Sequence, residues 1–196
     1  MPAASVTSRS AGMDTLGELF SSRIRASVLA YLVAREEARF SLTELSRALN
    51  LSVSSVQHEC YKLERLGVLK GRREGASRRY WLDREQPFVP VLMWLVITVV
   101  GQNQVLGYAL QDIEGLTGAV LSTGGLTLVG DLGLDQLAIV QERAEKILDT
   151  ANLNVAFYDP ATWQTYAAEH HHTIRDLQSA SPEVLLETGS VFKDLF

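Results

Sequence analysis

The sequence has few of the residues that build disulfide frameworks, metal clusters or membrane anchors. Cys60 is the single cysteine among 196 residues, which excludes an internal disulfide and a cysteine-rich zinc site. The longest apolar run, residues 89–101, is shorter than the roughly 20 residues that a helix needs to cross a bilayer. The opening residues contain no apolar segment typical of a secretory signal. These absences predict a globular cytoplasmic protein without a membrane segment.

Positive charge is scarce in the second half of the chain. Residues 85–196 contain 4 Lys and Arg against 14 Asp and Glu, a net charge of −10. Residues 1–84 contain 14 against 9, a net charge of +5. This distribution indicates that only the first half faces a polyanion such as nucleic acid. We therefore expect two modules with different roles.

Three helix signals follow one another in the basic half. Thr15 opens a first amphipathic helix over residues 15–37. Ser41 and Glu44 have the spacing of a capping box at the start of a second helix, and Ser52 is placed to cap a third. The second and third helices are separated by a tight turn, which predicts a helix-turn-helix.

The third helix has one apolar face, which we expect to be buried. It consists of Val53, Val56, Cys60, Leu63 and Leu66. A cysteine within such a stripe is expected to be buried and unreactive. The outward face then carries groups that can reach DNA: Ser54, Ser55, Gln57, His58, Tyr61 and Lys62. Gln57 and His58 can address base edges in the major groove, whereas the first-turn hydroxyls suit phosphate. A surface His58 without a base contact is the alternative.

A basic hairpin is predicted directly after these helices. Gly67 ends the third helix, and residues 68–82 form two strand-like runs around a turn at Gly75. The hairpin gathers five cations: Lys70, Arg72, Arg73, Arg78 and Arg79. A helix-turn-helix followed by a hairpin is the element order of a winged helix-turn-helix domain, whose wing reaches phosphates or a minor groove. A merely solvated basic surface is the alternative.

The stretch from "LFSSRIRASVLAYL" through "LTELSRALNLSVSSVQHECYKLERLGVLKGRREGASRRYWL" to the linker "QPFVPVL" resembles winged-helix regulators of the ArsR-like type. Members of this kind carry a nucleotidyltransferase-like domain behind the DNA-binding domain. The resemblance implies an α+β protein: an N-terminal winged helix-turn-helix followed by a small mixed-sheet nucleotidyltransferase-like domain. We divide the chain into a flexible tail at 1–13, the DNA-binding domain at 14–86, a linker and long apolar helix at 87–112, and the second domain at 113–196.

The same resemblance predicts that the second domain has lost catalysis. In that family a Gly-Ser pair holds nucleotide phosphates and an Asp-x-Asp pair holds metal ions. Matching on "LTLVGD" places Leu121 and Ser122 at the Gly-Ser positions, and Thr123 and Gly125 at the two Asp positions. Asn154 stands where a third carboxylate is expected. We therefore expect no catalytic residue, no metal and no cofactor.

The remaining signals concern assembly and regulation. The helix predicted over residues 89–110 is apolar around most of its circumference, which favours a homodimer. Three consecutive histidines, His170, His171 and His172, point about 100° apart on a helix and cannot all ligate one ion, so we expect them at the surface.

Taken with the charge and motifs, these signals predict a sequence-specific transcription regulator that binds double-stranded DNA as a dimer. Its second domain serves dimerisation or sensing. One alternative is a ligand-gated regulator that binds a nucleotide or another small-molecule effector near residues 122–125. The other is an active nucleotidyltransferase.

Overall fold

The computed structural model describes residues 4–193 and 195, with only the backbone described for residues 4–10. The chain divides into two compact units, with the boundary between Val105 and Leu106. Each unit has its own sheet. We describe the two units separately.

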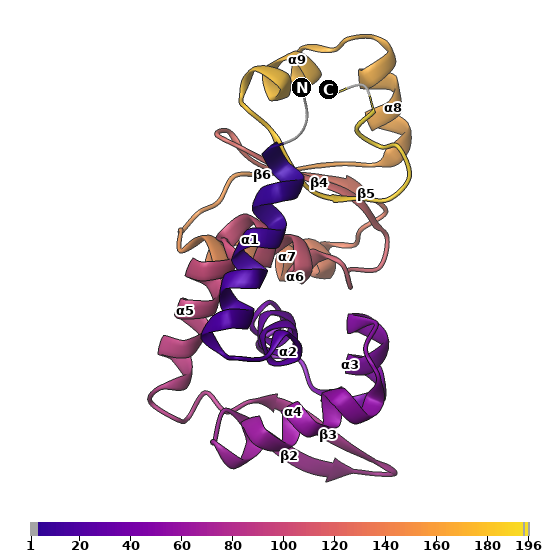
Figure 1. Ribbon diagram of the computed structural model, residues 1–196. Helices are drawn as coiled ribbons and strands as arrows, with labels where there is room; N and C mark the ends of the chain where they lie inside the picture. The colour runs from indigo at the N-terminus through magenta and orange to yellow at the C-terminus, as the bar shows by residue number, and fades with distance from the viewer. Residues whose placement is uncertain (1–3, 194, 196) are drawn as a thin grey trace. The chain divides into compact units, whose positions relative to one another are not determined.

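Unit 1 is a winged helix-turn-helix (Figure 1). Its elements are α1 (Ala4–Leu19), α2 (Arg23–Val33), β1 (Phe40–Ser41), α3 (Leu42–Leu49), α4 (Val53–Arg65), β2 (Leu69–Glu74), β3 (Ser77–Leu82) and α5 (Val89–Val100). The hairpin of β2 and β3 forms the wing, and β1 pairs with β3 to give the antiparallel order β1-β3-β2. The core between the helices is aliphatic, with Leu29, Leu45 and Val56 fully buried.

The start and end signals of the helix-turn-helix are confirmed. The Ser41 hydroxyl accepts from the Glu44 N–H, while the Glu44 carboxylate accepts from the Ser41 N–H, so the capping box is complete. Ser52 caps α4 by accepting from the Ser55 N–H. Gly67 follows α4 with φ +74°, the left-handed conformation that favours glycine after a helix.

The N-terminal segment is more ordered than the sequence predicts. A flexible tail was expected over residues 1–13, but α1 begins at Ala4, and residues 1–3 lie outside the described residues. Thr15 is not a helix start, because it lies inside α1 and its hydroxyl donates to the Ala11 carbonyl at 2.9 Å. At Gly12 a side chain would meet the Val99 carbonyl at 2.6 Å, so this glycine lets α1 approach α5 closely.

The single helix expected over residues 15–37 is wrong. α1 ends at Leu19, and α2 begins after Ser22, whose hydroxyl accepts from the Arg25 N–H at 3.2 Å. Ser21 between them has φ 50°, which no helix interior adopts. The apolar spacing continues across this break, because both helices face the same core. The spacing of apolar residues alone therefore does not reveal the break between α1 and α2.

The long apolar helix expected over residues 89–110 is also two helices. Gly101, with φ +99°, ends α5, and α6 (Gln102–Leu110) follows. In the described part of the chain no single helix is long and apolar enough to cross a membrane. Only α5 and α6 taken together, bent at their junction, meet that criterion by length and composition.

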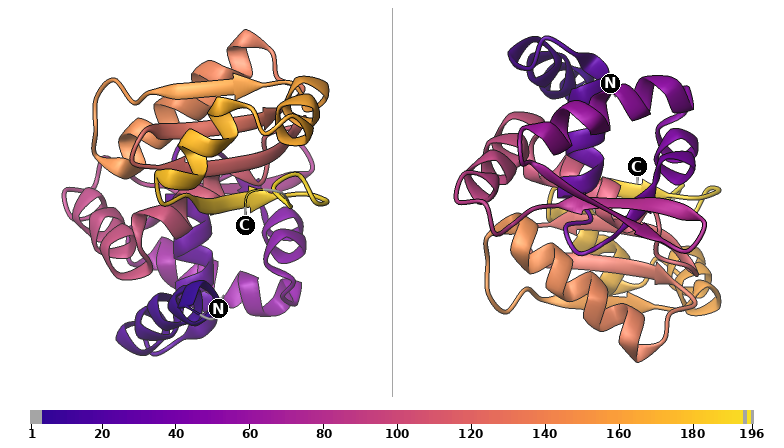
Figure 2. Two further views of the ribbon diagram at one scale, coloured as in Figure 1. Left: turned by 90° about the horizontal axis from the view of Figure 1, so that it is seen from above. Right: turned by 90° about the horizontal axis from the view of Figure 1, so that it is seen from below.

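Unit 2 is a mixed four-stranded sheet with helices on both faces, as the sequence predicts for an α+β domain. After α6 come β4 (Leu116–Ser122), β5 (Gly125–Gly130), α7 (Leu134–Leu148), β6 (Val155–Tyr158), α8 (Pro160–Ala168), α9 (His172–Ser179) and β7 (Glu183–Glu187). The strand order is β6-β5-β4-β7, with β5 and β6 parallel and the other pairs antiparallel. Figure 2 shows α7 on one face of the sheet and α8 and α9 on the other.

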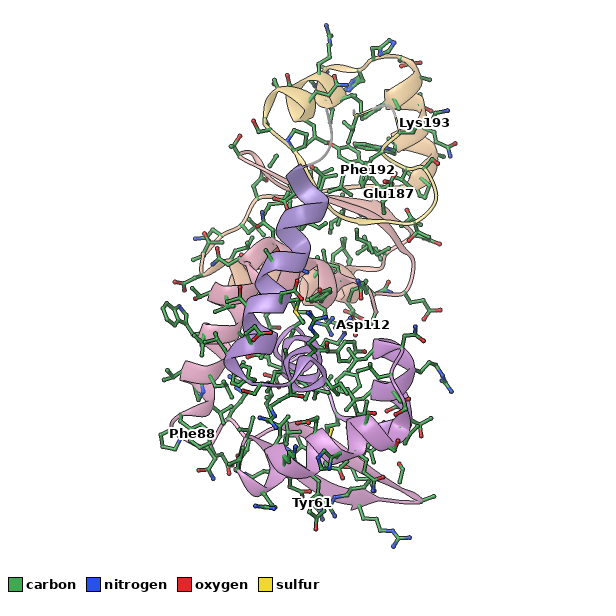
Figure 3. All side chains as sticks on the ribbon, viewed as in Figure 1. Tyr61, Phe88, Asp112, Glu187, Phe192 and Lys193 are labelled. Atoms are coloured by element: carbon green, nitrogen blue, oxygen red, sulfur yellow. The ribbon has the colours of Figure 1, made fainter. Side chains whose placement is uncertain are left out.

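An aromatic cluster holds α8 and α9 against the sheet. Phe192 packs edge-on against Trp163, with ring centroids 5.5 Å apart, and lies over Gly118, where any side chain would collide with its ring. The Phe192 N–H donates to the Glu187 carboxylate at 2.9 Å (Figure 3). Trp163 donates its indole N–H to the Val191 carbonyl. These contacts fix the face of the sheet where a cleft is described below.

Candidate nucleic-acid interface

The N-terminus of α4 carries a cluster of three hydroxyls. The Ser52 hydroxyl lies 2.7 Å from that of Ser55 and 3.1 Å from that of Ser54. Ser54 is exposed and Ser55 is half-buried. The cluster organises the first turn, where backbone amides and hydroxyls favour a phosphate oxygen.

The outward face of α4 is polar, as the sequence predicts. Gln57 and His58 are exposed in its first half, and Tyr61 follows one turn later with 62% of its surface exposed. Figure 3 shows Tyr61 directed away from the body of unit 1. Arg65 continues this face one turn beyond Tyr61 and is exposed. The sequence analysis missed Arg65, although helical spacing from Tyr61 identifies it.

The inward face of α4 differs from the expected stripe at both ends. Val56, Cys60 and Leu63 are buried as expected, but Val53 and Leu66 are 44% and 62% exposed. They lie at the two termini of the helix, where α4 leaves the core. The sequence therefore predicts burial correctly for the middle residues of the stripe and incorrectly for its two end residues.

Glu59 is a buried carboxylate that the sequence analysis did not identify. It is 6% exposed and accepts a hydrogen bond from Arg25 of α2 at 2.8 Å. Burial alone would raise the pKa of Glu59, but the hydrogen bond and charge of Arg25 outweigh it, so the pKa is lowered. Lys62 also contacts Glu59, at 3.5 Å. Lys62 is half-buried, and this contact keeps its ammonium group close to α4.

Two arginines of the wing are paired with acids of the helix-turn-helix. Arg78 of β3 forms an ion pair with Glu64 of α4, and Arg79 forms one with Glu44 of α3. The Ser41 N–H and, more weakly, Arg79 lower the pKa of Glu44. These contacts tie the wing to both helices, so Arg78 and Arg79 fix the position of the hairpin.

The remaining wing cations divide into one paired and two free side chains. Lys70 pairs with Asp83 at 3.0 Å and with Glu85. Arg72 and Arg73 of β2 lie opposite Arg79 and Arg78, are exposed, and have no ion pair among the described residues.

Gly71, between Lys70 and Arg72 on β2, leaves room for the paired side chains. A Cβ atom at Gly71 would lie 2.7 Å from the Glu64 carboxylate and 2.8 Å from Nε of Arg78. The absence of a side chain at Gly71 therefore permits the contact between the wing and α4.

Cys60 is buried in the stripe of α4, and burial raises the pKa of its thiol to about 12. The thiolate is the reactive form, so we expect Ellman's reagent to label Cys60 only after unfolding in guanidinium. As a control, Ala76→Cys at the exposed wing turn, in a Cys60→Ser background, should react at once in the native state. Comparable labelling of native Cys60 would contradict its burial.

The segment predicted as a vestigial nucleotide site forms a tight hairpin turn. Ser122 ends β4 and pairs with Gly125 at the start of β5, with Thr123 and Gly124 as the turn. Asn154 donates to the Gly124 carbonyl at 2.8 Å and so braces the turn. Within the described part of the chain, no three His, Cys, Asp or Glu side chains are grouped to hold a metal ion.

Two aspartates, Asp131 and Asp135, lie near the start of α7. The N-cap is Gly133, whose N–H donates to the Gln136 side chain at 2.8 Å. Asp135 lies in the first turn of α7, where a negative charge interacts favourably with the helix dipole. The role of Asp135 is therefore structural.

The three histidines lie between α8 and α9, with His172 as the first residue of α9. His171 caps α9 by accepting from the Thr173 N–H and stacks on Tyr166 with ring centroids 4.0 Å apart. The expectation of surface histidines is confirmed for His170 and His172, which are exposed, whereas His171 is half-buried.

Comparisons with solved structures match about half of this chain. No protein-family model matches the sequence, and no curated protein matches it. Reduced HlyU from Vibrio cholerae N16961 is similar at 24% identity and a TM-score of 0.36, over 50% of this chain and 97% of that one. The homodimeric winged helix-turn-helix DNA-binding domain (fragment 1–100) of Mb0332 from Mycobacterium bovis, described as a possible ArsR-family transcriptional regulator, is similar at 18% identity and a TM-score of 0.35. That match covers 50% of this chain and 87% of the fragment.

Proposed function

We propose that this protein is a transcription regulator that binds double-stranded DNA in a sequence-specific manner through unit 1. The observation that carries the proposal is the pair of unpaired, exposed arginines on the wing, Arg72 and Arg73, in the same domain as the polar outward face of α4. A helix with amide and imidazole groups suits the major groove, and free guanidinium groups suit phosphates.

Within this proposal the eleven candidate residues have three roles. Gln57 and His58 read base edges. The DNA backbone is held by Ser54, Ser55, Tyr61, Lys62, Arg72 and Arg73, with Arg65 added from the structure. The wing is held in place by Lys70, Arg78 and Arg79, whose charges are matched by carboxylates of unit 1. This last role supplements the phosphate contacts that the sequence predicts for them.

We further propose that the protein acts as a homodimer through α5. This helix exposes three large apolar side chains, those of Val91, Trp94 and Leu95, and its N-cap residue Phe88 is exposed as well. Figure 3 shows Phe88 at the N-terminal end of α5. Two-fold symmetry predicts a pseudo-palindromic operator, with half-sites about 10 base pairs apart or a multiple of that distance.

The role of unit 2 in this proposal is non-catalytic. The positions that the resemblance assigns to metal-binding carboxylates are held by Thr123 and Gly125, both within or beside the tight turn. We propose that unit 2 is a degenerate nucleotidyltransferase-like domain that serves dimerisation or sensing. Metal-dependent incorporation of labelled nucleoside triphosphates by the purified protein would contradict this role.

Replacing Gln57 and His58 together with alanine is expected to relax base preference while leaving general DNA affinity largely intact. A good pair of hydrogen bonds to a base edge contributes about 1–3 kcal/mol of discrimination, so the ratio of specific to random binding should fall by about tenfold or more. The measurement is recovery and sequencing of retained genomic fragments at two salt concentrations.

The matched control for this double variant is Gln111→Ala, an exposed glutamine of unit 2. It should recover the same two-fold motif as the unaltered protein. Uniform retention of all fragments by the unaltered protein, lost at higher salt, would instead show a non-specific DNA-coating protein and overturn the proposed function.

A further inference from the structure

A cleft of about 230 Å³ opens in unit 2 between the β4–β5 turn, the beginning of β6 and α9. Its polar lining includes Ser122 and Asn154 beside the turn, Thr127 of β5, Tyr158 of β6, and His172, Thr173 and Asp176 of α9. Thr127 is buried on the floor, whereas Asp176 and His172 lie at the exposed rim. A cleft of this size suits a metabolite smaller than most drug-like ligands.

The backbone N–H groups of the two turn residues beside the cleft, Thr123 and Gly124, are already bonded within the protein. The Thr123 N–H donates to the Ala180 carbonyl at 3.3 Å, and the Gly124 N–H donates to the Ser122 hydroxyl at 3.2 Å. The Asn154 amide is committed to the Gly124 carbonyl. Among the residues that the structure describes, no Lys or Arg lines the cleft. Nucleotide phosphates depend on such donors and cations, so the cleft does not suit them.

Several N–H groups in the first turn of α9 also have hydrogen-bond partners within the protein. His171 accepts from the Thr173 N–H through its ring, and its carbonyl accepts from the N–H groups of Ile174 and Arg175. An anion at this helix start would have to displace these bonds. The N–H groups of residues 173–175 at the start of α9, like those of Thr123 and Gly124 in the turn, therefore already have partners within the protein.

The carboxylate that lines the cleft, in contrast, is available to bind a ligand. The Asp176 carboxylate has no ion pair or hydrogen bond with any residue that the structure describes. Asp176 lines the cleft together with His172 and Thr173 of the same helix, and it is exposed, so a ligand in the cleft can reach its carboxylate.

We propose that this cleft binds a small organic cation with an ammonium or guanidinium group, which Asp176 pairs and the hydroxyls of Thr127 and Tyr158 help to orient. Residues 106–196 contain 4 Lys and Arg against 13 Asp and Glu, a surplus of negative charge that attracts cations to this unit. The inference goes beyond DNA binding and does not depend on it.

The test is calorimetric titration of the full-length protein with putrescine in the absence of DNA. Saturable binding of one putrescine per chain is expected, with no heat from butane-1,4-diol, which replaces both ammonium groups by hydroxyls. Titration with Mg-ATP should give no saturable signal. Saturable ATP binding, or equal binding of the diol, would overturn the proposal.

Variants distinguish binding at a specific site in the cleft from general electrostatic attraction of putrescine to an acidic domain. Asp176→Asn should weaken putrescine binding at least tenfold, and Thr127→Val should weaken it several-fold, with thermal unfolding of both variants confirming that the domain is intact. Glu114→Gln removes an equally exposed carboxylate outside the cleft and should bind as the unaltered protein does. Equal losses in the Asp176 and Glu114 variants would show diffuse attraction only and overturn the proposal.

The readouts for the two proposals are independent. Putrescine binding is measured without DNA, and retention of genomic fragments is measured without putrescine. A protein that retains a two-fold motif but binds no putrescine would leave the proposed function standing and remove the inferred site. The reverse result would remove the proposed function and keep the site.

Discussion

Changing Arg72 and Arg73 together to alanine is expected to weaken binding to every DNA sequence by about a hundredfold at low salt. These are the wing arginines without an ion pair among the described residues, so their guanidinium groups are free to meet phosphates. A hydrogen bond to a charged group contributes about 1.5–3 kcal/mol, and two contacts at the lower end of this range give an effect of this size. The slope of log affinity against log salt should become shallower by about 2.

The control for the wing variant is Arg175→Ala, an exposed arginine of unit 2, which should leave both affinity and salt slope unchanged. Fluorescence anisotropy with one operator and one random duplex, at several salt concentrations, makes the comparison. Arg78→Ala or Arg79→Ala should change the slope less than the double variant, because these side chains are already paired. An equal change in slope would show that the division of roles on the wing is wrong.

Changing Trp94 to glutamate is expected to convert the protein to a monomer, with the dissociation constant of the dimer raised at least a hundredfold. Trp94 is 66% exposed on α5 beside Val91 and Leu95, so in the proposed dimer it would be buried against the second copy. Tryptophan side chains commonly contribute more than 2 kcal/mol to an interface, and an unpaired carboxylate there adds a desolvation cost. Sedimentation equilibrium measures the result directly.

Leu134→Glu is the matched control for the dimer prediction. Leu134 is 85% exposed at the start of α7 in unit 2, so the same change of chemistry is made outside α5. This variant should remain dimeric and bind DNA normally, whereas Trp94→Glu should also lose most operator affinity, because each monomer contacts a single half-site. A monomeric unaltered protein, or a dimeric Trp94→Glu variant, would contradict the assignment of α5.

The helix-turn-helix was predictable because its signals are local. A capping box lies within four residues, and both Ser41 and Ser52 cap the helices that the sequence assigns to them. The sequence analysis missed the helix breaks at Ser21 and Gly101, because the apolar residues keep their helical spacing across both positions. The positive φ angles at these two residues, which end the helices, leave no mark in that spacing.

The ion pairs of the wing could not be predicted from the sequence, because their partners are distant in the chain. Arg79 and Glu44 are 35 positions apart, and Arg78 and Glu64 are 14 apart, so only the folded chain brings them together. The count of basic residues correctly marks the hairpin but does not separate free cations from paired ones. Glu59 was missed because a carboxylate on a helix is ordinarily exposed, and its partner Arg25 lies on another helix.

The ion pairs that hold the wing also set how the protein searches a genome. Carboxylates of the same domain already neutralise three of the five hairpin cations, so fewer condensed ions leave the DNA when the hairpin meets an arbitrary sequence. Complexes with DNA outside the operator should therefore be short-lived. When a cell holds few molecules of the protein, a larger fraction of them then stays free to find the operator than if all five cations were unpaired.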